Sequence, residues 1–237
     1  MKKVLYRIAL ILISLAGAVL LVAVSHYDFF PLKESVCSAA GDPLEIPVEE
    51  YVKPHIDQSV LKYPSDHYLD TIFENYPQIE SATINLNPAG KVTFDYDLKT
   101  PVVYLSLDVI YGLTARGELV PANGYNLPIV SGLKLNNPRL YCPLNNSQIA
   151  YTLKLARIIS SLPPEIKKEV SIIDISDTLG LTITMDDIDP LLVMGHGNEV
   201  KKFLMVERMN RFLKTLPEDI IVVDFRFDDQ VVLKRSF

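Results

Sequence analysis

The hydrophobic and polar positions divide the chain into one uninterrupted apolar run followed by two regions of mixed pattern. Residues Ile8 to Val24 carry no charge. As a helix this run extends roughly 25 Å, close to the ~30 Å hydrocarbon core of a bilayer. Basic residues precede the run (Lys2, Lys3 and Arg7), and Asp28 is the first charged residue after it. This asymmetry predicts one transmembrane helix, with the N-terminus in the cytoplasm and the bulk of the chain across the membrane.

A cleaved signal peptide is the alternative interpretation of the same run. Ala23-Val24-Ser25 has the small residues that a cleavage site requires. The apolar part of a signal peptide is usually about 7–15 residues long, however, and this run is longer. Its length therefore favours an uncleaved anchor.

Residues 35–104 combine a helical pattern with an alternating one. Leu69, Ile72, Phe73 and Tyr76 recur at helical spacing before Pro77, which predicts an amphipathic helix ending there. The stretches 82–86 and 92–98 then alternate apolar and polar residues on either side of a turn at Asn87 to Gly90. Such alternation indicates a half-buried antiparallel hairpin, so we expect a small module with helices on a short sheet.

Residues 105–237 contain several short strand patterns and two longer helical ones. The helical patterns cover Gln148 to Leu162 and Val200 to Leu216. On the second helix the side chains expected to face inward are Met205, Met209, Phe212, Leu213 and Leu216. Those expected to face outward are Lys201, Lys202, Glu207, Arg208, Arg211 and Lys214. The pattern predicts a β-rich domain of antiparallel strands with two helices. The expected fold class is therefore α+β, with divisions at 1–34, 35–104 and 105–237.

Composition narrows the possible partners without identifying one. The net charge is −6, which argues against a broad nucleic-acid-binding surface. Cys37 and Cys142 are the only cysteines, and they are either two separate thiols or one disulfide. No C-x-x-C pair is present.

Candidate catalytic and metal-binding residues form no recognisable constellation. His196 lies in a Gly-His-Gly turn, but the other histidines (His26, His55 and His67) provide no metal-ligand spacing with it. Asp186, Asp187 and Asp189 lack the regular spacing and terminal glutamate of a calcium loop. No nucleophile elbow, P-loop or dinucleotide fingerprint occurs. We therefore expect no catalytic residue, no cofactor, no metal site, no small-molecule substrate and no enzymatic activity.

Two parts of the sequence resemble known families. The stretches 73–84, 87–92 and 99–102 resemble the core of a POTRA domain, in which a helix ends at a proline and a hairpin leaves through a basic-x-Pro sequence. The segment 127–132 is similar to the Leu-Pro-aliphatic-x-Gly segment of the FtsQ/DivIB cell-division proteins. The C-terminal order of Met194-Gly195, a helix over 202–212, Asp224 to Phe227 and a last strand at 231–235 is also similar to that family.

The resemblance to FtsQ/DivIB implies a single-pass protein of the inner (plasma) membrane at the division septum, with its bulk periplasmic or extracytoplasmic. It implies a non-catalytic divisome scaffold that recruits and connects division proteins for septum formation and septal peptidoglycan synthesis. FtsB/FtsL-like (DivIC/FtsL-like) partners would add a strand to the last strand of the chain. The residues implied to form this site are Val231, Val232, Leu233, Lys234 and Arg235, with Phe225, Arg226 and Phe227 supporting it.

Three alternatives accompany this interpretation. Lys234 and Arg235 suit an acidic partner, but charged residues on an edge strand also prevent aggregation. An exported, membrane-anchored enzyme is a second possible function, although its motifs are absent. A POTRA-bearing transport or assembly component is a third, but such proteins normally carry repeated POTRA units and one is predicted here.

Overall fold

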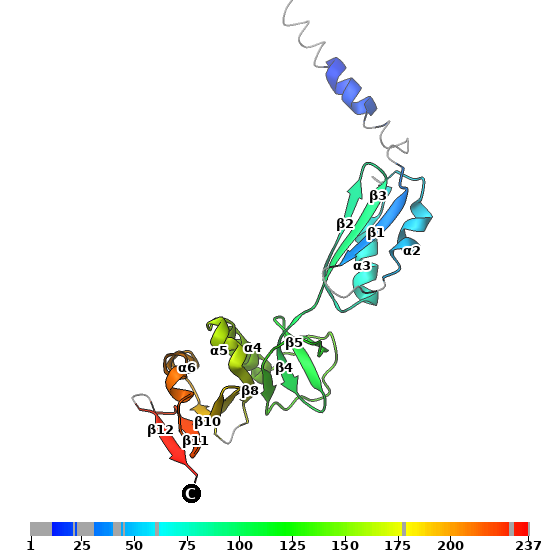
Figure 1. The fold of residues 1–237 in the computed structure, drawn as a ribbon. Coiled ribbons are helices and arrows are strands. Elements are labelled where there is room, and N and C mark those ends of the chain that lie inside the picture. The colour runs from blue at the N-terminus through cyan, green and yellow to red at the C-terminus, as the bar shows by residue number, and fades with distance from the viewer. Residues whose placement is uncertain are drawn as a thin grey trace, which may run out of the picture. The chain divides into compact units, whose positions relative to one another are not determined.

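The structure is a computed structural model, and it describes residues 11–20, 22, 31–39, 44, 46–59, 62–176, 179–227 and 230–236. The fold is α+β, and the chain divides into two compact units, Met1–Leu98 and Lys99–Phe237 (Figure 1). The predicted domain boundary after residue 104 lies inside strand β4 (Pro101–Ser106), and all of β4 belongs to the second unit.

The predicted transmembrane helix is contradicted. Among the described residues, none of the helices combines the length and the apolar character that a membrane crossing requires. The described helical residues within Ile8 to Val24 are 11–20 and 22. Ten helical residues rise roughly 15 Å, about half of a ~30 Å hydrocarbon core. The other positions of this prediction, and the alternative cleavage site at 23–25, lie outside the described residues.

The first unit is a three-stranded sheet with helices packed against it. Its strands β1 (Glu34–Ala39), β2 (Ile79–Asn87) and β3 (Lys91–Leu98) lie in the order β1-β3-β2. The helices are α2 (Val48–Val52), η1 (Lys53–His55) and α3 (Ser65–Asn75). Strands β2 and β3 form the predicted antiparallel hairpin. Ile72 of α3 is buried, whereas Phe73 is 38% exposed, because adjacent helical residues point about 100° apart and only one of them faces the sheet.

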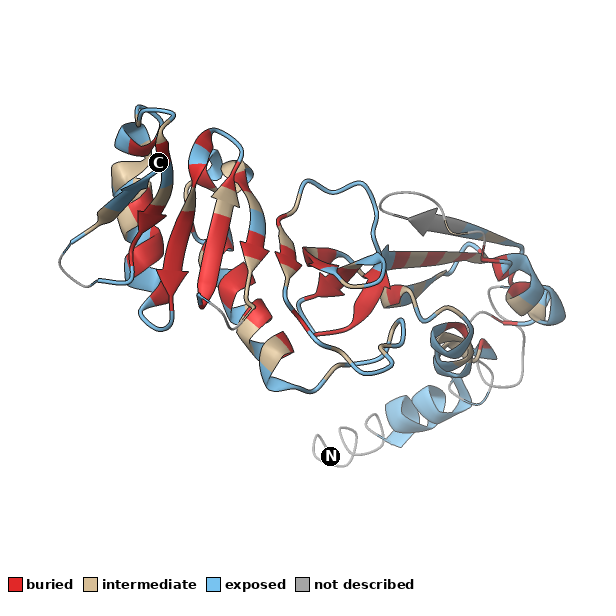
Figure 2. Cartoon of the chain, turned by 90° about the horizontal axis from the view of Figure 1, so that it is seen from below, coloured by how far each residue is buried: buried red, intermediate tan, exposed pale blue. Residues whose placement is uncertain are grey.

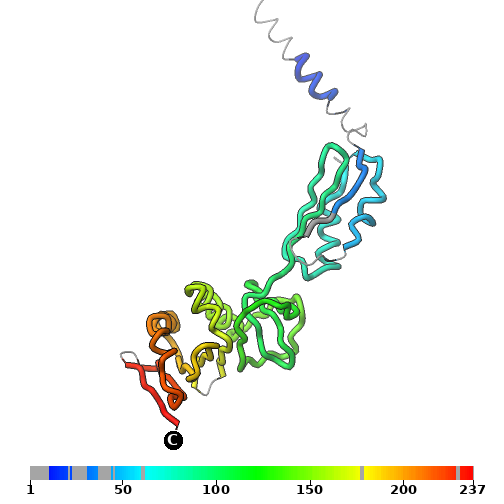
Figure 3. Tube along the Cα trace, in the orientation of Figure 1, coloured from blue at the N-terminus to red at the C-terminus, as the bar shows by residue number. Residues whose placement is uncertain are grey.

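The second unit is built on a nine-stranded sheet in the order β12-β11-β10-β9-β8-β7-β4-β5-β6. The strands that follow β4 are β5 (Ile110–Thr114), β6 (Leu119–Pro121), β7 (Ile129–Ser131), β8 (Val170–Asp174), β9 (Leu181–Met185), β10 (Ile188–Gly195), β11 (Ile220–Asp224) and β12 (Val232–Arg235). The helices are α4 (Ser147–Ser160), α5 (Pro164–Glu169) and α6 (Glu199–Leu213), and Figure 3 traces their path between the strands.

The prediction of a purely antiparallel sheet with two helices is wrong, since the sheet is mixed and the described part of this unit has three helices. Strand β10 pairs parallel with β11, β7 with β8, and β4 with β7. The reason is topological. Helix α6 returns the chain to the starting end of the sheet between β10 and β11, and helices α4 and α5 do so between β7 and β8. The segment 122–128, which contains no helix, does so between β6 and β7. Such crossovers produce parallel neighbours, whereas a tight turn produces antiparallel ones.

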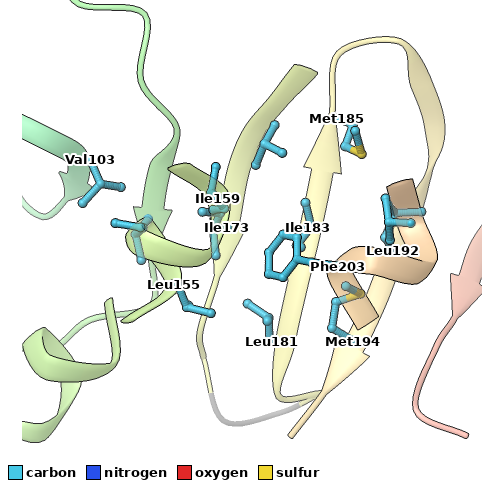
Figure 4. Close-up of a cluster of buried hydrophobic side chains, with 14 of the residues drawn as sticks. Val103, Leu155, Ile159, Ile173, Leu181, Ile183, Met185, Leu192, Met194 and Phe203 are labelled. Atoms are coloured by element: carbon cyan, nitrogen blue, oxygen red, sulfur yellow. The ribbon is translucent and has the colours of Figure 1, made fainter. Parts of the chain in front are cut away.

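The hydrophobic core of the second unit lies between the sheet and its helices. Leu155 and Ile159 of α4 and Phe203 of α6 are at most 2% exposed. They pack against buried strand residues such as Ile173 and Ile183, as the close-up in Figure 4 shows. Buried positions continue along the central strands of the sheet in Figure 2. Burying a side chain of this size stabilises the fold by about 1.5–3 kcal/mol, so this layer holds the sheet and helices together.

Two predicted orientations on α6 are wrong. Lys202, expected to face outward, is only 5% exposed, and its Nζ donates hydrogen bonds to the carbonyl oxygens of Met194 (2.6 Å) and His196 (3.1 Å). These bonds compensate for removing the ammonium group from water. Phe212, expected to face inward, is 49% exposed. Leu213, the next residue, occupies the core position and is 1% exposed.

Candidate functional site

Strand β12 forms one edge of the nine-stranded sheet. It pairs antiparallel with β11, and Figures 1 and 3 show it in red running back alongside that strand. No other described strand pairs with its opposite side. An edge of this kind presents unpaired backbone N–H and C=O groups, which form a template for an additional strand.

Backbone hydrogen bonds show which residues of β12 face outward. The N–H of Ser236 donates to the carbonyl oxygen of Asp219 at 2.8 Å, so Ser236 faces β11. The pairing has a register shift between Ile220 and Val222, and the extra residue lies on β11, opposite Lys234 and Arg235. Alternation along β12 is therefore kept, so Val232 and Lys234 also face β11, and Leu233 and Arg235 face away. On β11, the N–H of Phe225 donates to Val193 of β10 at 2.8 Å, which places the bonding groups of Asp224 toward β12 and agrees with this assignment.

The eight residues predicted for the site lie in different environments. Phe225 is fully buried, so it supports the edge from the core and cannot contact a partner. Phe227 and Leu233 are 45% and 39% exposed. The remaining five are half-buried (Val231 and Val232) or exposed (Arg226, Lys234 and Arg235). The structure therefore brings seven of the predicted residues to the surface around β12.

A buried carboxylate that the sequence analysis did not include in the site organises the charges beside β12. Asp224 is 1% exposed. Its Oδ2 accepts a hydrogen bond from Arg226 Nη2 at 2.7 Å, its Oδ1 accepts one from Arg226 Nε at 2.9 Å, and Lys234 Nζ lies 3.9 Å from Oδ2. The side-chain hydrogen bonds from Arg226 are the main reason that the pKa of Asp224 lies below its usual range. Asp224 therefore stays ionised and holds two cationic side chains next to the edge strand.

Gly195 provides room for this arrangement. Its φ is +65°, a conformation that glycine adopts without strain. A Cβ built at this position would lie 2.6 Å from Cγ of Arg226, closer than real contacts allow. The Asp-x-Arg spacing at 224–226 and the glycine turn were visible in the sequence. The contact between them was not, because it joins the end of β10 to the end of β11.

The candidate catalytic and metal-binding residues are scattered or engaged elsewhere. His196 is exposed in the turn after β10. Of the three aspartates, Asp187 lies beside Lys214, with Oδ2 and Nζ 3.2 Å apart. Within the described part of the chain, no group of three or more His, Cys, Asp or Glu side chains could hold a metal ion. Cys142 is a free, exposed thiol, and the side chain of Cys37 lies outside the described positions.

Two comparisons with known proteins bear on the resemblance to FtsQ/DivIB. No family model matches the chain, and a search of curated proteins found no match either. The resemblance to FtsQ/DivIB therefore stays a prediction from the sequence.

Proposed function

We propose that the protein is a non-catalytic scaffold of the cell-division machinery that binds an FtsB/FtsL-like partner by adding a strand to β12. The observation that carries the proposal is the outward-facing backbone of Leu233 and Arg235 at a sheet edge that no other described strand covers. Together these two residues offer two N–H and two C=O groups. A net contribution of about 0.5–1.5 kcal/mol per hydrogen bond gives roughly 2–6 kcal/mol before the cost of ordering the partner.

The side chains around β12 specify the chemistry of the added strand. Leu233 lies opposite the buried Val223, so its exposed part extends the apolar face of the sheet. Lys234 lies on the other face with the Asp224–Arg226 pair. The partner strand would therefore place an apolar side chain beside Leu233 and an acidic one beside Lys234 or Arg226. Alternation of this kind provides selectivity, while the backbone bonds provide affinity.

We further propose that the protein acts at the division septum of the inner (plasma) membrane, with both units extracytoplasmic and the first unit recruiting other division proteins. The sequence resemblance supports this part of the proposal. A fluorescent fusion in dividing cells provides the test, with a band at mid-cell as the expected result. A uniform signal throughout dividing cells would contradict the proposed location.

The decisive experiment on the edge is Leu233→Pro. Proline lacks the N–H that a partner strand would use, and at this outward position no bond to β11 is removed. We expect pull-down of the FtsB/FtsL-like partner to fall at least roughly tenfold, equivalent to about 1.4 kcal/mol, while the melting temperature stays near that of the wild type. The matched control is Leu233→Val, which keeps the N–H and the apolar side chain. Undiminished binding by Leu233→Pro would refute this site.

A further inference from the structure

We propose that a groove between α4 and α6 is a second docking surface, and that its occupant is an acidic amphipathic helix of a partner protein. The groove lies within the second unit and encloses about 610 Å³. The side chains that matter for the proposal are Lys154 from α4 and Val200, Lys201, Leu204, Met205 and Arg208 from α6.

The apolar part of the groove is a row of residues along α6. Val200 is 55% exposed and Leu204 is 42% exposed, and one helical turn separates them. Met205 adds a third, half-buried apolar side chain. Single exposed apolar residues are common on protein surfaces. Apolar side chains that share one hollow and have a charged rim are instead typical of binding surfaces.

The rim of the groove is cationic, although the whole chain has a net charge of −6. Its lining includes three cations (Lys154, Lys201 and Arg208) and one carboxylate (Glu199), a formal net charge of +2. Glu199 is only 7% exposed, and its Oε2 already accepts a hydrogen bond from Lys154 Nζ at 2.8 Å. The charge that a ligand meets at the mouth of the groove is therefore positive, which selects an acidic partner.

The pKa of Glu199 supports this distribution of charge. Burial alone would raise the pKa, but the hydrogen bonds that the carboxylate accepts, from Lys154 foremost, outweigh burial and lower it. Tyr151 also donates to Oε1 of Glu199 at 3.2 Å. Glu199 is thus ionised and internally satisfied at neutral pH, so it neutralises Lys154, and the other two cations of the lining, Lys201 and Arg208, are exposed on α6.

The walls of the groove favour a helical ligand over an extended one. They are helices, whose interior backbone groups are already hydrogen-bonded, so an added strand finds no partners there. Val200, Leu204 and Arg208 follow one another at intervals of four residues and form a ridge on α6. A partner helix with apolar residues at i and i+4 and with Asp or Glu beside them would match this ridge. The surface is distinct from β12, because it belongs to the helical layer and not to the sheet edge (Figure 1).

The test uses the full-length chain and a fluorescent 18-residue helical peptide with leucines at i, i+3, i+4 and i+7 and glutamates on its other face. Fluorescence anisotropy measures binding to the wild type and to Leu204→Asp/Arg208→Glu. We expect the double variant to bind at least roughly tenfold more weakly. Raising the salt concentration should also weaken wild-type binding, because the attraction is between exposed charges.

The matched control is Val109→Asp/Lys168→Glu, which likewise replaces one exposed aliphatic residue by Asp and one exposed cation by Glu, outside the groove. It should bind the peptide as the wild type does. A peptide with lysine in place of glutamate should bind at least roughly tenfold more weakly to the wild type. Equal binding of the two peptides, equal loss in the control, or no binding of the glutamate peptide would each overturn the proposal. Binding of the β12 partner should be unaffected by Leu204→Asp/Arg208→Glu, so the two surfaces can fail independently.

Discussion

The two edges of the nine-stranded sheet differ in how their backbone groups are used. At the β6 edge, the segment 140–144 covers the strand: Tyr141 N–H donates to Leu119 O at 2.8 Å, and Leu144 N–H donates to Gly117 O at 2.9 Å. Isolated bridges join Leu119 to Leu140 and Glu118 to Pro143. At the β12 edge, no other strand among the described residues pairs beyond Leu233 and Arg235.

The exposure of the side chains also differs between the β6 edge and the β12 edge. Leu119 and Val120 of β6 are 1% and 2% exposed, and Pro121 ends the strand with a residue that has no N–H. In β12, Leu233, Lys234 and Arg235 are all exposed. Proteins generally cover or blunt sheet edges, since open edges lead to aggregation. This chain covers the β6 edge with its own segment 140–144, whereas the described part of the β12 edge carries two charged residues, Lys234 and Arg235. Such charges blunt an edge by themselves, and an edge left open in this way also suits the added strand proposed above.

The largest effect is expected when leucine is replaced by alanine at each of the two edges. Leu119→Ala should lower the free energy of unfolding by about 2–5 kcal/mol, because it leaves a cavity in a covered core. Leu233→Ala should change it by no more than about 0.5 kcal/mol, as is usual for exposed positions. Urea denaturation of both variants measures the difference. Equal losses would mean that β12 is covered to the same extent as β6.

A second test compares two glycines at the end of β10, Gly195 and Gly197. It separates the cost of backbone strain from the support that Gly195 gives to the β12 edge. Gly195→Ala and Gly197→Ala each place an alanine at positive φ, +65° and +70°, which costs about 1–2 kcal/mol. The new Cβ at 195 also meets Arg226, whereas nothing lies within 4 Å of the one at 197. We therefore expect thermal melting to show the larger destabilisation for Gly195→Ala, and we expect weaker partner binding only for that variant. Equal binding by both would remove Arg226 from the site.

A third test uses the alternation of outward and inward residues along β12. Val232→Pro removes a hydrogen bond to β11 and should cost about 0.5–1.5 kcal/mol in the free energy of unfolding. Leu233→Pro removes an N–H that faces outward and should cost less. Urea denaturation compares the two variants. The reverse order would show that the assignment of outward and inward residues is incorrect.

The smallest expected effect is a pH dependence at Asp224. Its pKa is lowered in the folded state, mainly by hydrogen bonds from Arg226, so the folded state binds fewer protons than the unfolded state. Its stabilising contribution is complete above the ordinary aspartate pKa of about 3.9 and is lost as the pH falls below that value through the lowered pKa of the folded state. The stability difference between the wild type and Asp224→Asn should therefore shrink over that range. Asp189→Asn, at an exposed position, serves as the control, and a difference independent of pH would contradict the argument.

Sequence reasoning was most successful where a local pattern decides the structure. The alternation on both sides of Asn87 to Gly90 predicted the β2–β3 hairpin, and the helical pattern at 148–162 corresponds to α4. It was least successful on α6, where Lys202 is buried and Phe212 is exposed. According to the helical period, several apolar and cationic residues of α6 lie near the border between its buried and its exposed face. Only the carbonyl groups at the end of β10 explain why a lysine enters the interior.

The sequence by itself predicted many of the local elements, including a last strand at 231–235 that corresponds to β12 (Val232–Arg235), because hydrophobic alternation and turn residues act over a few neighbouring positions. The tertiary structure alone decided that the sheet is mixed, that one edge is covered and the other open, and that Asp224, Arg226 and Gly195 meet beside β12. These features depend on how strands distant along the chain pair with one another. Local residue patterns act over a few positions, whereas the direction in which two strands pair depends on the long connections that join them.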